Sequence, residues 1–203
     1  AMEEVELKMS PGFVQVYNEI LVNAVDQHSK GGKAMSLIDI NVDPKDGSIS
    51  VENDGGSIPV ALHQATGLLT PTLVFGEFLS GDNFDDSDVR FVGGKNGVGA
   101  KAANVYSTRF QVEVKDPASG SHFLQTWEDN MRIRREPEIS ELEPGAGPSV
   151  KVSFWPDLRR FGLKTINRAH TRLLRARAYD AAACTAKSVQ VRFNGKELQV
   201  ADF

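Results

Sequence analysis

The sequence lacks the features that mark several specialised classes of protein. Its single cysteine, Cys184, excludes an internal disulfide, and we expect this residue to be a buried apolar side chain in a reducing compartment. No hydrophobic run approaches the length of a membrane span. The four histidines have no cysteine partners at metal-binding spacing. These shortages argue against a disulfide scaffold, a membrane-spanning helix and a cysteine-based metal site.

A basic excess is also missing. The chain has 23 Lys and Arg against 27 Asp and Glu, a formal net charge of −4, which argues against binding nucleic acid by itself. One basic stretch, Arg159 to Arg177, could touch DNA, although a solvated helix face is the better interpretation. The 203 residues, 40% hydrophobic and 25% charged, are ordinary for a globular chain with one sizeable core.

Glycine is concentrated in one run, from Gly93 to Lys101, which has four glycines within seven residues. Such a loop can bring several N–H groups to one anion, and a helix that starts near Ala100 would add free donors and a partial positive charge. The run fits neither the P-loop spacing nor the dinucleotide fingerprint. A flexible surface loop therefore remains the alternative to a phosphate site.

A polar stripe runs along the first predicted helix. Glu19, Asn23 and Asp26 are spaced at i, i+4 and i+7, so they share one face, and Val16 and Val22 border it. A polar row edged by valines suggests an acid and an amide at the rim of a pocket. A simple exposed stripe is the alternative.

Two further segments lie between this helix and the glycine run. Asn53-Asp54-Gly55 follows a predicted strand and is typical of a sharp bend that can present a side chain inward, or of an ordinary turn. Ser80 to Asp88 is too polar to pack. It lacks the residue order of a calcium loop, and its position before the glycine run favours a lid.

The order of predicted elements indicates the fold class. Helices are expected from Ser10–Pro11, over Ile58–Leu79 with a break at Thr70–Pro71, from Ala100, and over Lys164–Thr185. Strands are expected at Met35–Val42, Ser48–Glu52, Thr108–Lys115, His122–Glu128, near Arg132, at Ser149–Phe154 and at Val189–Phe193 before an Asn194-Gly195 hairpin turn. This order is not βαβ alternation. It predicts an α+β, two-layer sandwich with a mixed, mostly antiparallel sheet and helices on one face.

Four segments, taken in order, resemble the N-terminal ATPase domain of the type IIA DNA topoisomerases. They are 17–24 (Tyr-Asn-Glu-Ile-Leu-Val-Asn-Ala), 93–101 (Gly-Gly-Lys-Asn-Gly-Val-Gly-Ala-Lys), 126–131 (Thr-Trp-Glu-Asp-Asn-Met) and 154–158 (Phe-Trp-Pro-Asp-Leu). The likeness is to the eukaryotic-type enzymes, within the superfamily of gyrase, Hsp90, histidine kinases and MutL. It implies a Bergerat-type (GHKL) ATPase domain over residues 1–203.

The resemblance also implies roles for individual residues. Glu19 matches the general base that activates the water attacking the γ-phosphate, and Asn23 matches the residue that holds Mg²⁺. Asn53 matches the adenine-binding position, in a pocket lined by residues such as Ile58. Lys101 and the backbone of the glycine run would hold developing negative charge. The ATP-binding set that the resemblance implies is Asn23, Asp26, Asn53, Ile58, Asp82, Asn83, Gly94, Lys95, Asn96, Gly97, Val98, Gly99, Ala100 and Lys101.

Three positions depart from the family pattern. Ser57 stands where relatives often have the second glycine of Gly-x-Gly, and Asp82 stands where a serine often precedes the lid asparagine. The strand threonine that helps to bind adenine in relatives aligns with Val150 or, with a shift of one residue, with Ser149. The effect of these departures on the pocket stays open at this stage.

The resemblance implies ATP and Mg²⁺ as cofactors, and in the whole enzyme a homodimer that passes one DNA duplex through another, in the nucleus or a DNA-containing organelle. We expect this chain to lack the second ATPase subdomain and the DNA breakage core. It should therefore bind ATP or a competitive inhibitor, stay mostly monomeric and hydrolyse slowly, with no membrane partner. The alternatives are a gyrase-like or other ATPase of the superfamily, a nucleotide-binding switch without fast hydrolysis and, more distantly, a dinucleotide-binding oxidoreductase.

Overall fold

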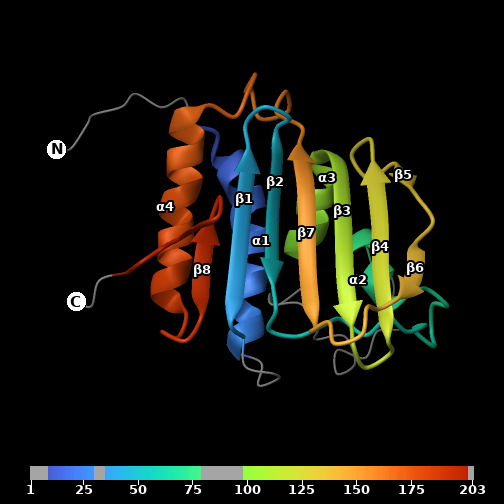
Figure 1. Cartoon of the computed structure of the whole chain (residues 1–203). Helices are drawn as coiled ribbons and strands as arrows, with labels where there is room; N and C mark the ends of the chain where they lie inside the picture. The colour runs from blue at the N-terminus through green and yellow to red at the C-terminus, as the bar shows by residue number, and fades with distance from the viewer. Residues whose placement is uncertain (1–8, 30–34, 79–97, 201–203) are drawn as a thin grey trace.

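The computed structural model describes residues 9–29, 35–78 and 98–200, and within them the chain forms helices and strands that build one sheet with helices packed on it (Figure 1). The helices are α1 (Pro11–Ser29), α2 (Thr70–Gly76), α3 (Val98–Val105) and α4 (Arg168–Cys184). The strands are β1 (Leu37–Asp43), β2 (Ser48–Asn53), β3 (Ser107–Asp116), β4 (Ser121–Glu128), β5 (Ile133–Arg134), β6 (Glu138–Glu141), β7 (Ser149–Pro156), β8 (Gln190–Phe193) and β9 (Lys196–Glu197).

The strands form one nine-stranded mixed sheet. Its order is β5-β4-β3-β7-β2-β1-β8-β9, with β6 paired to β4. The pair of β1 and β8 is parallel, and the other pairs of described strands are antiparallel. The predicted α+β sandwich with a mixed, mostly antiparallel sheet is confirmed.

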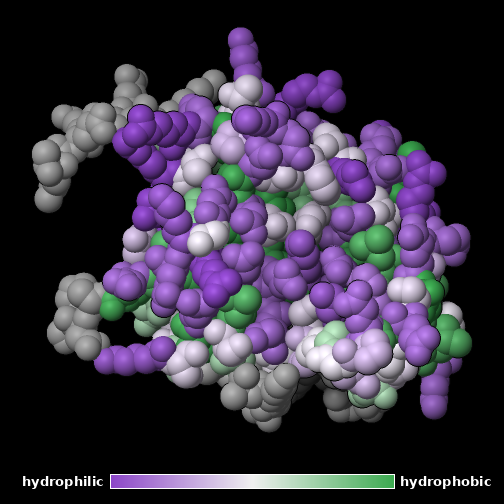
Figure 2. Space-filling model, in the orientation of Figure 1, coloured by the Kyte–Doolittle hydropathy of each residue, from purple (hydrophilic) through white to green (hydrophobic). Residues whose placement is uncertain are grey.

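The two faces of the sheet have different surroundings. Helices α1, α2 and α3 lie behind the strands as Figure 1 is drawn, and α4 packs on α1 and β8. The core between the layers is rich in aromatic side chains, including Tyr17 of α1, Phe110 of β3, Trp127 of β4 and Phe154 of β7, none more than 1% exposed. The face toward the viewer in Figure 2 is mostly hydrophilic, because alternate strand residues there are polar, as in the ion pair of Lys151 with Glu52.

Most predicted boundaries are confirmed within a few residues, and four expectations are wrong. Residues 58–69 form a turn and an isolated bridge between Leu62 and Leu69 instead of a helix. Pro59 and Gly67 disfavour a helix in this segment, and Gly67 has a positive φ of 67°, outside the range of a right-handed helix. Helix α4 starts at Arg168 rather than Lys164, after a capping box of Asn167 and His170. Strand β6 was not expected. Cys184 is exposed rather than buried.

The open end of the β1–β2 hairpin is held by one carboxylate. Asp54, directly after β2, accepts hydrogen bonds from the backbone N–H groups of Ser36 and Leu37, both at 2.8 Å, and from the Ser36 hydroxyl. Burial alone would raise the pKa of Asp54, but these hydrogen bonds outweigh it and hold the pKa below its ordinary value of 3.8. The carboxylate therefore joins the start of β1 to the end of β2.

A close approach also joins α2 to the sheet. A Cβ at Gly76, the last residue of α2, would lie 2.7 Å from both Cζ2 and Nε1 of the Trp127 indole. The indole is 1% exposed, so it has little room to move. Glycine is required at this position by the packing of the ring.

The Asp54 clamp makes stability depend on pH. Because the folded-state pKa lies below the unfolded one, the stabilisation is present above the unfolded pKa and is lost as the pH falls through the folded value. We expect Asp54→Asn to lower the free energy of unfolding at pH 7, with a deficit that shrinks below about pH 4. Denaturation of both proteins across this range checks it. Asp180→Asn, on the exposed face of α4, is the control, and a deficit that does not change with pH would contradict the clamp.

The Gly76 contact predicts a strong effect of a single methyl group. Gly76→Ala should lower the free energy of unfolding by about 1–3 kcal/mol, because the methyl group overlaps a buried indole that cannot retreat. Urea denaturation measures the change. Gly56→Ala is the matched control, since no atom lies within 4 Å of its added Cβ. Equal stability of the two variants would show that the indole is free to move.

Candidate nucleotide site

The polar stripe of α1 lies at the border of the core. Glu19, Asn23 and Asp26 are all half-buried, as expected for a rim. The expected valine edges are only half confirmed, because Val16 is 5% exposed and packs in the core whereas Val22 is 51% exposed. Helix α1 packs on both α3 and β2, so the stripe lies among the elements that carry the other predicted site residues.

Glu19 meets the end of the glycine run. A Cβ at Gly99 would overlap Glu19 Oε2 and would lie 2.8 Å from Cδ, so the carboxylate lies directly against the Gly99 backbone. Gln15, one turn earlier in α1, donates a hydrogen bond to Glu19 Oε1. A hydrogen bond within α1 thus holds Glu19 Oε1, and Glu19 Oε2 lies against the backbone of α3.

The Gly99 contact lies in the first turn of α3. The N–H groups at the start of an α-helix have no partner within the helix, and the first described turn of α3 contains those of Val98, Gly99 and Ala100. The helix dipole adds partial positive charge at this end. A carboxylate and a set of donors for an anion therefore lie side by side, and only glycine at position 99 lets them approach so closely.

Lys101 is 6% exposed, and its nearest opposite charge is Glu77, just after α2. Burial lowers the pKa of Lys101, and the Glu77 carboxylate opposes that shift. Glu77 also forms an ion pair with Arg134 of β5. Lys101 lies about 200° round the helix from Gly99, so its side chain leaves α3 on a different side from the one that faces Glu19.

Asn23 carries a buried amide group with spare hydrogen-bonding capacity. Its Nδ2 atom is buried and has no hydrogen-bond partner among the described residues. Nitrogen and oxygen of a side-chain amide exchange places on a 180° rotation, so the same position can present an oxygen. A buried polar atom without a partner is costly, and here it lies one helical turn from Glu19.

The second part of the candidate site lies at one end of the sheet. Asn53, the last residue of β2, is 5% exposed, stands opposite Val150 of β7, and accepts a long hydrogen bond of 3.4 Å from Gly55 N–H. Ile58, 3% exposed, is buried in the core near this end. Gly55 is needed locally, because a Cβ there would lie 2.7 Å from Met35 Cε.

The remaining predicted residues lie outside the part of the chain that the structure describes. They are Asp82, Asn83, Gly94, Lys95, Asn96 and Gly97. The lid expected at Ser80–Asp88 falls in the same gap. The described site is therefore formed by α1, the start of α3 and the end of β2.

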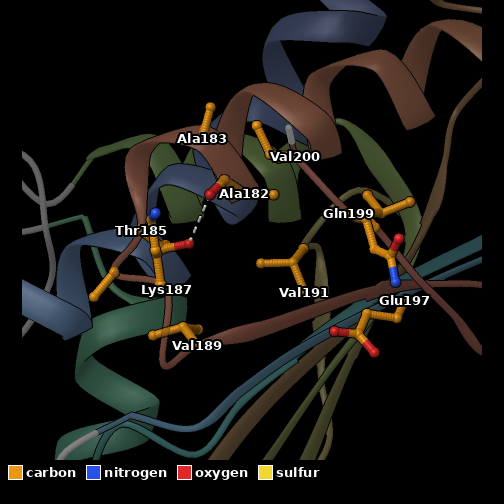
Figure 3. A pocket seen from close by; sticks show the side chains of 11 residues that line it. Ala182, Ala183, Thr185, Lys187, Val189, Val191, Glu197, Gln199 and Val200 are labelled. Carbon is orange, nitrogen blue, oxygen red and sulfur yellow. Dashed lines mark hydrogen bonds between the residues drawn. The ribbon is translucent and has the colours of Figure 1, made fainter. Parts of the chain in front are cut away.

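A separate hollow of about 600 Å³ lies between the C-terminal end of α4 and the strands β8 and β9 (Figure 3). Its lining includes Ala182, Thr185 and Val191, with Glu197 and Gln199 at one side in the view. None of the predicted site residues lines it. It is distinct from the candidate nucleotide site.

Two features of the site were missed from the sequence. Asp116, at the end of β3, is 3% exposed and accepts hydrogen bonds from Ser57 Oγ at 2.9 Å and from Val60 N–H at 3.0 Å. The electrostatic influence of Glu77 on Lys101 was not expected either. Both join segments that are far apart in the sequence, and no local pattern signals such pairs.

The described helices and composition limit what else the site can be. No described helix is long and apolar enough to cross a membrane. The described residues contain no cluster of three or more His, Cys, Asp or Glu side chains placed to hold a metal ion.

Comparisons with known proteins agree with this geometry. The family model for histidine kinase-, DNA gyrase B- and HSP90-like ATPases matches residues 9–158. DNA topoisomerase 2 of Candida glabrata is 39% identical over 95% of the chain, and the mitochondrial DNA topoisomerase 2 of Dictyostelium discoideum is 41% identical over 93%. The chain spans only 14% and 15% of the length of these two curated relatives.

A solved structure gives the same result. The ATPase region of Saccharomyces cerevisiae topoisomerase II, bound to ICRF-187 (dexrazoxane), superposes with a TM-score of 0.84 at 37% identity, over 94% of this chain and 50% of that one. The family match covers most of the chain. The likeness in sequence and the likeness in fold both point to the eukaryotic DNA topoisomerase II branch of this family. The chain belongs to the histidine kinase-, DNA gyrase B- and HSP90-like ATPase family and is homologous to the ATPase region of eukaryotic DNA topoisomerase II.

Proposed function

We propose that the chain is an ATP-binding and ATP-hydrolysing domain of a type II DNA topoisomerase. The observation that carries this proposal is the approach of the Glu19 carboxylate to Gly99 in the first turn of α3. A general base and a set of anion donors have to meet at the γ-phosphate, and these two groups already lie together.

In the proposed reaction, the Glu19 carboxylate takes a proton from a water molecule, whose oxygen forms a bond to the γ-phosphorus. The bond from that phosphorus to the β–γ bridging oxygen breaks, and ADP and phosphate result. The N–H groups of Val98, Gly99 and Ala100, in the first described turn of α3, stabilise negative charge on the phosphates. The Lys101 side chain adds positive charge on another side of α3, where the Glu77 carboxylate acts on it electrostatically.

The amide of Asn23 fits a magnesium site in which the substrate supplies most ligands. Its buried, unpartnered amide can present an oxygen, and magnesium usually keeps phosphate and water ligands beside one or two protein oxygens. When bound, the ion would neutralise charge on the β- and γ-phosphates. Asp26, one turn further along α1, lies on the same stripe.

The adenine base is assigned to the sheet end at Asn53. A buried amide can hydrogen-bond the edge of a base, which gives selectivity because a wrong base leaves the amide unpaired. Ile58 supplies apolar lining. Asp82 and Asn83, with the run from Gly94 to Gly97, would complete the site from outside the described residues.

For the whole enzyme we propose that ATP binding closes a homodimeric gate and drives passage of one DNA duplex through another, in the nucleus or a DNA-containing organelle. The support is homology to topoisomerase II over 14% to 15% of the relatives' length. The domain is assigned to residues 1–203. By itself it should bind ATP or a competitive inhibitor, remain mostly monomeric and turn over slowly.

Replacing Glu19 by Gln separates hydrolysis from binding. We expect Glu19→Gln to slow single-turnover hydrolysis by at least about 100-fold, because the amide cannot accept the proton, while ATP affinity changes less than about twofold. Chemical quench with excess protein, together with calorimetric titration of ATP, measures both. Glu138→Gln, on the exposed strand β6, is the control. Unchanged hydrolysis in Glu19→Gln would show that Glu19 is not the general base.

The Gly99 contact gives an independent test. Gly99→Ala should weaken ATP binding and hydrolysis together, since the methyl group overlaps the Glu19 carboxylate and must push α1 and α3 apart. Removing that carboxylate in Gly99→Ala/Glu19→Ala should recover at least about 1 kcal/mol of the lost stability. Denaturation of the single and double variants completes the cycle, with Gly56→Ala as the stability control, since its added Cβ meets no other described residue within 4 Å. Strict additivity would mean that the two residues do not touch.

A further inference from the structure

Asp116 is a buried carboxylate in which every hydrogen-bonding position is used. It lies at the end of β3, is 3% exposed, and accepts four hydrogen bonds of 2.8 to 3.2 Å. Two come from its own turn, from Ala118 N–H and the Ser119 hydroxyl. The other two come from the Ser57 hydroxyl and Val60 N–H, which lie more than 50 residues earlier in the chain. The carboxylate therefore bridges two separate segments.

The bridged segment, residues 57–60, belongs to the proposed base pocket. It begins four residues after Asn53, and it carries Ile58. It forms no strand or helix, so the sheet does not fix its backbone. Ser57, which departs from the family pattern, supplies the side-chain hydroxyl that reaches Asp116.

Packing holds the start of the segment only weakly. A hollow of about 500 Å³ opens beside it, lined by Gly56 and Ser57 on one side, by the turn that follows Asp116, and by residues 145–148. No atom of the other described residues lies within 4 Å of the position where a Cβ at Gly56 would be. With space on that side, the hydrogen bonds to Asp116 act together with the burial of Ile58 to hold the segment in place.

A carboxylate is the side chain that suits this bridge. Ionised Asp accepts at both oxygens, whereas Asn can accept at one and must donate at the other. Burial by itself would raise the pKa of Asp116, but hydrogen bonds from Val60, Ser119, Ser57 and Ala118 outweigh it and lower the pKa. The group is therefore ionised at neutral pH, with both oxygens free to accept.

We propose that Asp116 is a positioning residue for nucleotide selectivity: through Ser57 and Val60 it holds the segment that carries Ile58 against the base end of the site next to Asn53. This inference rests on the proposed ATP-binding function. It concerns the adenine base and not the phosphates, because the bridge lies at the end of β2 and β3 whereas the free N–H groups lie at the start of α3.

Two serine variants form a matched test, since both hydroxyls donate to the same carboxylate, Ser57 at 2.9 Å and Ser119 at 2.8 Å. Ser57→Ala should weaken ATP binding by about fivefold to tenfold and reduce the preference for ATP over GTP. Ser119→Ala, which leaves the bridge to residues 57–60 in place, should change ATP affinity by less than about twofold. Inorganic tripolyphosphate, which has no base, should bind both variants as it binds the wild-type chain. Calorimetric titration of the three ligands with Mg²⁺ gives these affinities.

Asp116→Asn provides a second variant, in which two of the four donors lose their acceptor, since each carboxylate oxygen accepts from two groups. Where it folds, it should repeat the loss of base selectivity seen with Ser57→Ala, and where it does not, the serine pair decides. Equal ATP affinities of Ser57→Ala and Ser119→Ala would overturn this inference. So would a loss of tripolyphosphate binding in Ser57→Ala as large as its loss of ATP binding. Neither result would overturn the proposed function. A wild-type chain that binds tripolyphosphate and GTP as well as ATP would also overturn this inference. A wild-type chain that binds no nucleotide would overturn the proposed function, and this inference with it.

Discussion

The rest of the site depends on the close packing of α1 against the first turn of α3. Helices α1 and α3 both pack on the sheet and on each other, and Glu19 can touch the α3 backbone only because Gly99 has no side chain. This one contact fixes the distance between an acidic side chain and the N–H groups in the first described turn of α3. An ordinary residue at position 99 would force the helices apart and would separate the two halves of the chemistry.

That packing also explains why the site is spread over distant parts of the sequence. Asn53 is presented by the last residue of β2, on which α1 packs, so the same helix contacts both ends of the proposed nucleotide site. Two buried or half-buried aspartates near the end of β2 act in the same way. Asp54 and Asp116 are carboxylates that accept backbone N–H groups from neighbouring segments: Asp54 holds the start of β1, and Asp116 holds residues 57–60, which belong to no strand. The rigid sheet thus ends in a set of irregular segments whose positions are set by ionised side chains.

Local features were predictable from the sequence, and non-local ones were not. The stripe of Glu19, Asn23 and Asp26 follows from helical spacing. The turn at Asn194-Gly195 follows from the Asn-Gly sequence, because these residue types tolerate the positive φ values, 48° and 72°, that the structure has there. The insertion of β7 between β3 and β2 depends on pairing between strands far apart in the chain, for which no short-range signal exists. The segment 58–69 has apolar residues at helical intervals, yet proline and glycine there prevent a helix. Asp116 looks like an ordinary turn residue in the sequence, and its role emerges only from the position of Ser57.

The parallel pair of β1 and β8 has a consequence for how the domain is made. Ile38 of β1 pairs with Val191 of β8, so one edge of the β1–β2 hairpin receives its partner strand only after β8 has been synthesised. Until then that edge presents unpaired backbone groups on a strand whose inward side chains, Ile38 and Ile40, are fully buried in the finished fold. Synthesis of the domain therefore passes through a stage with an exposed strand edge next to apolar side chains, and this stage, before α4 and β8 emerge, is the one in which the nascent domain is most prone to aggregate.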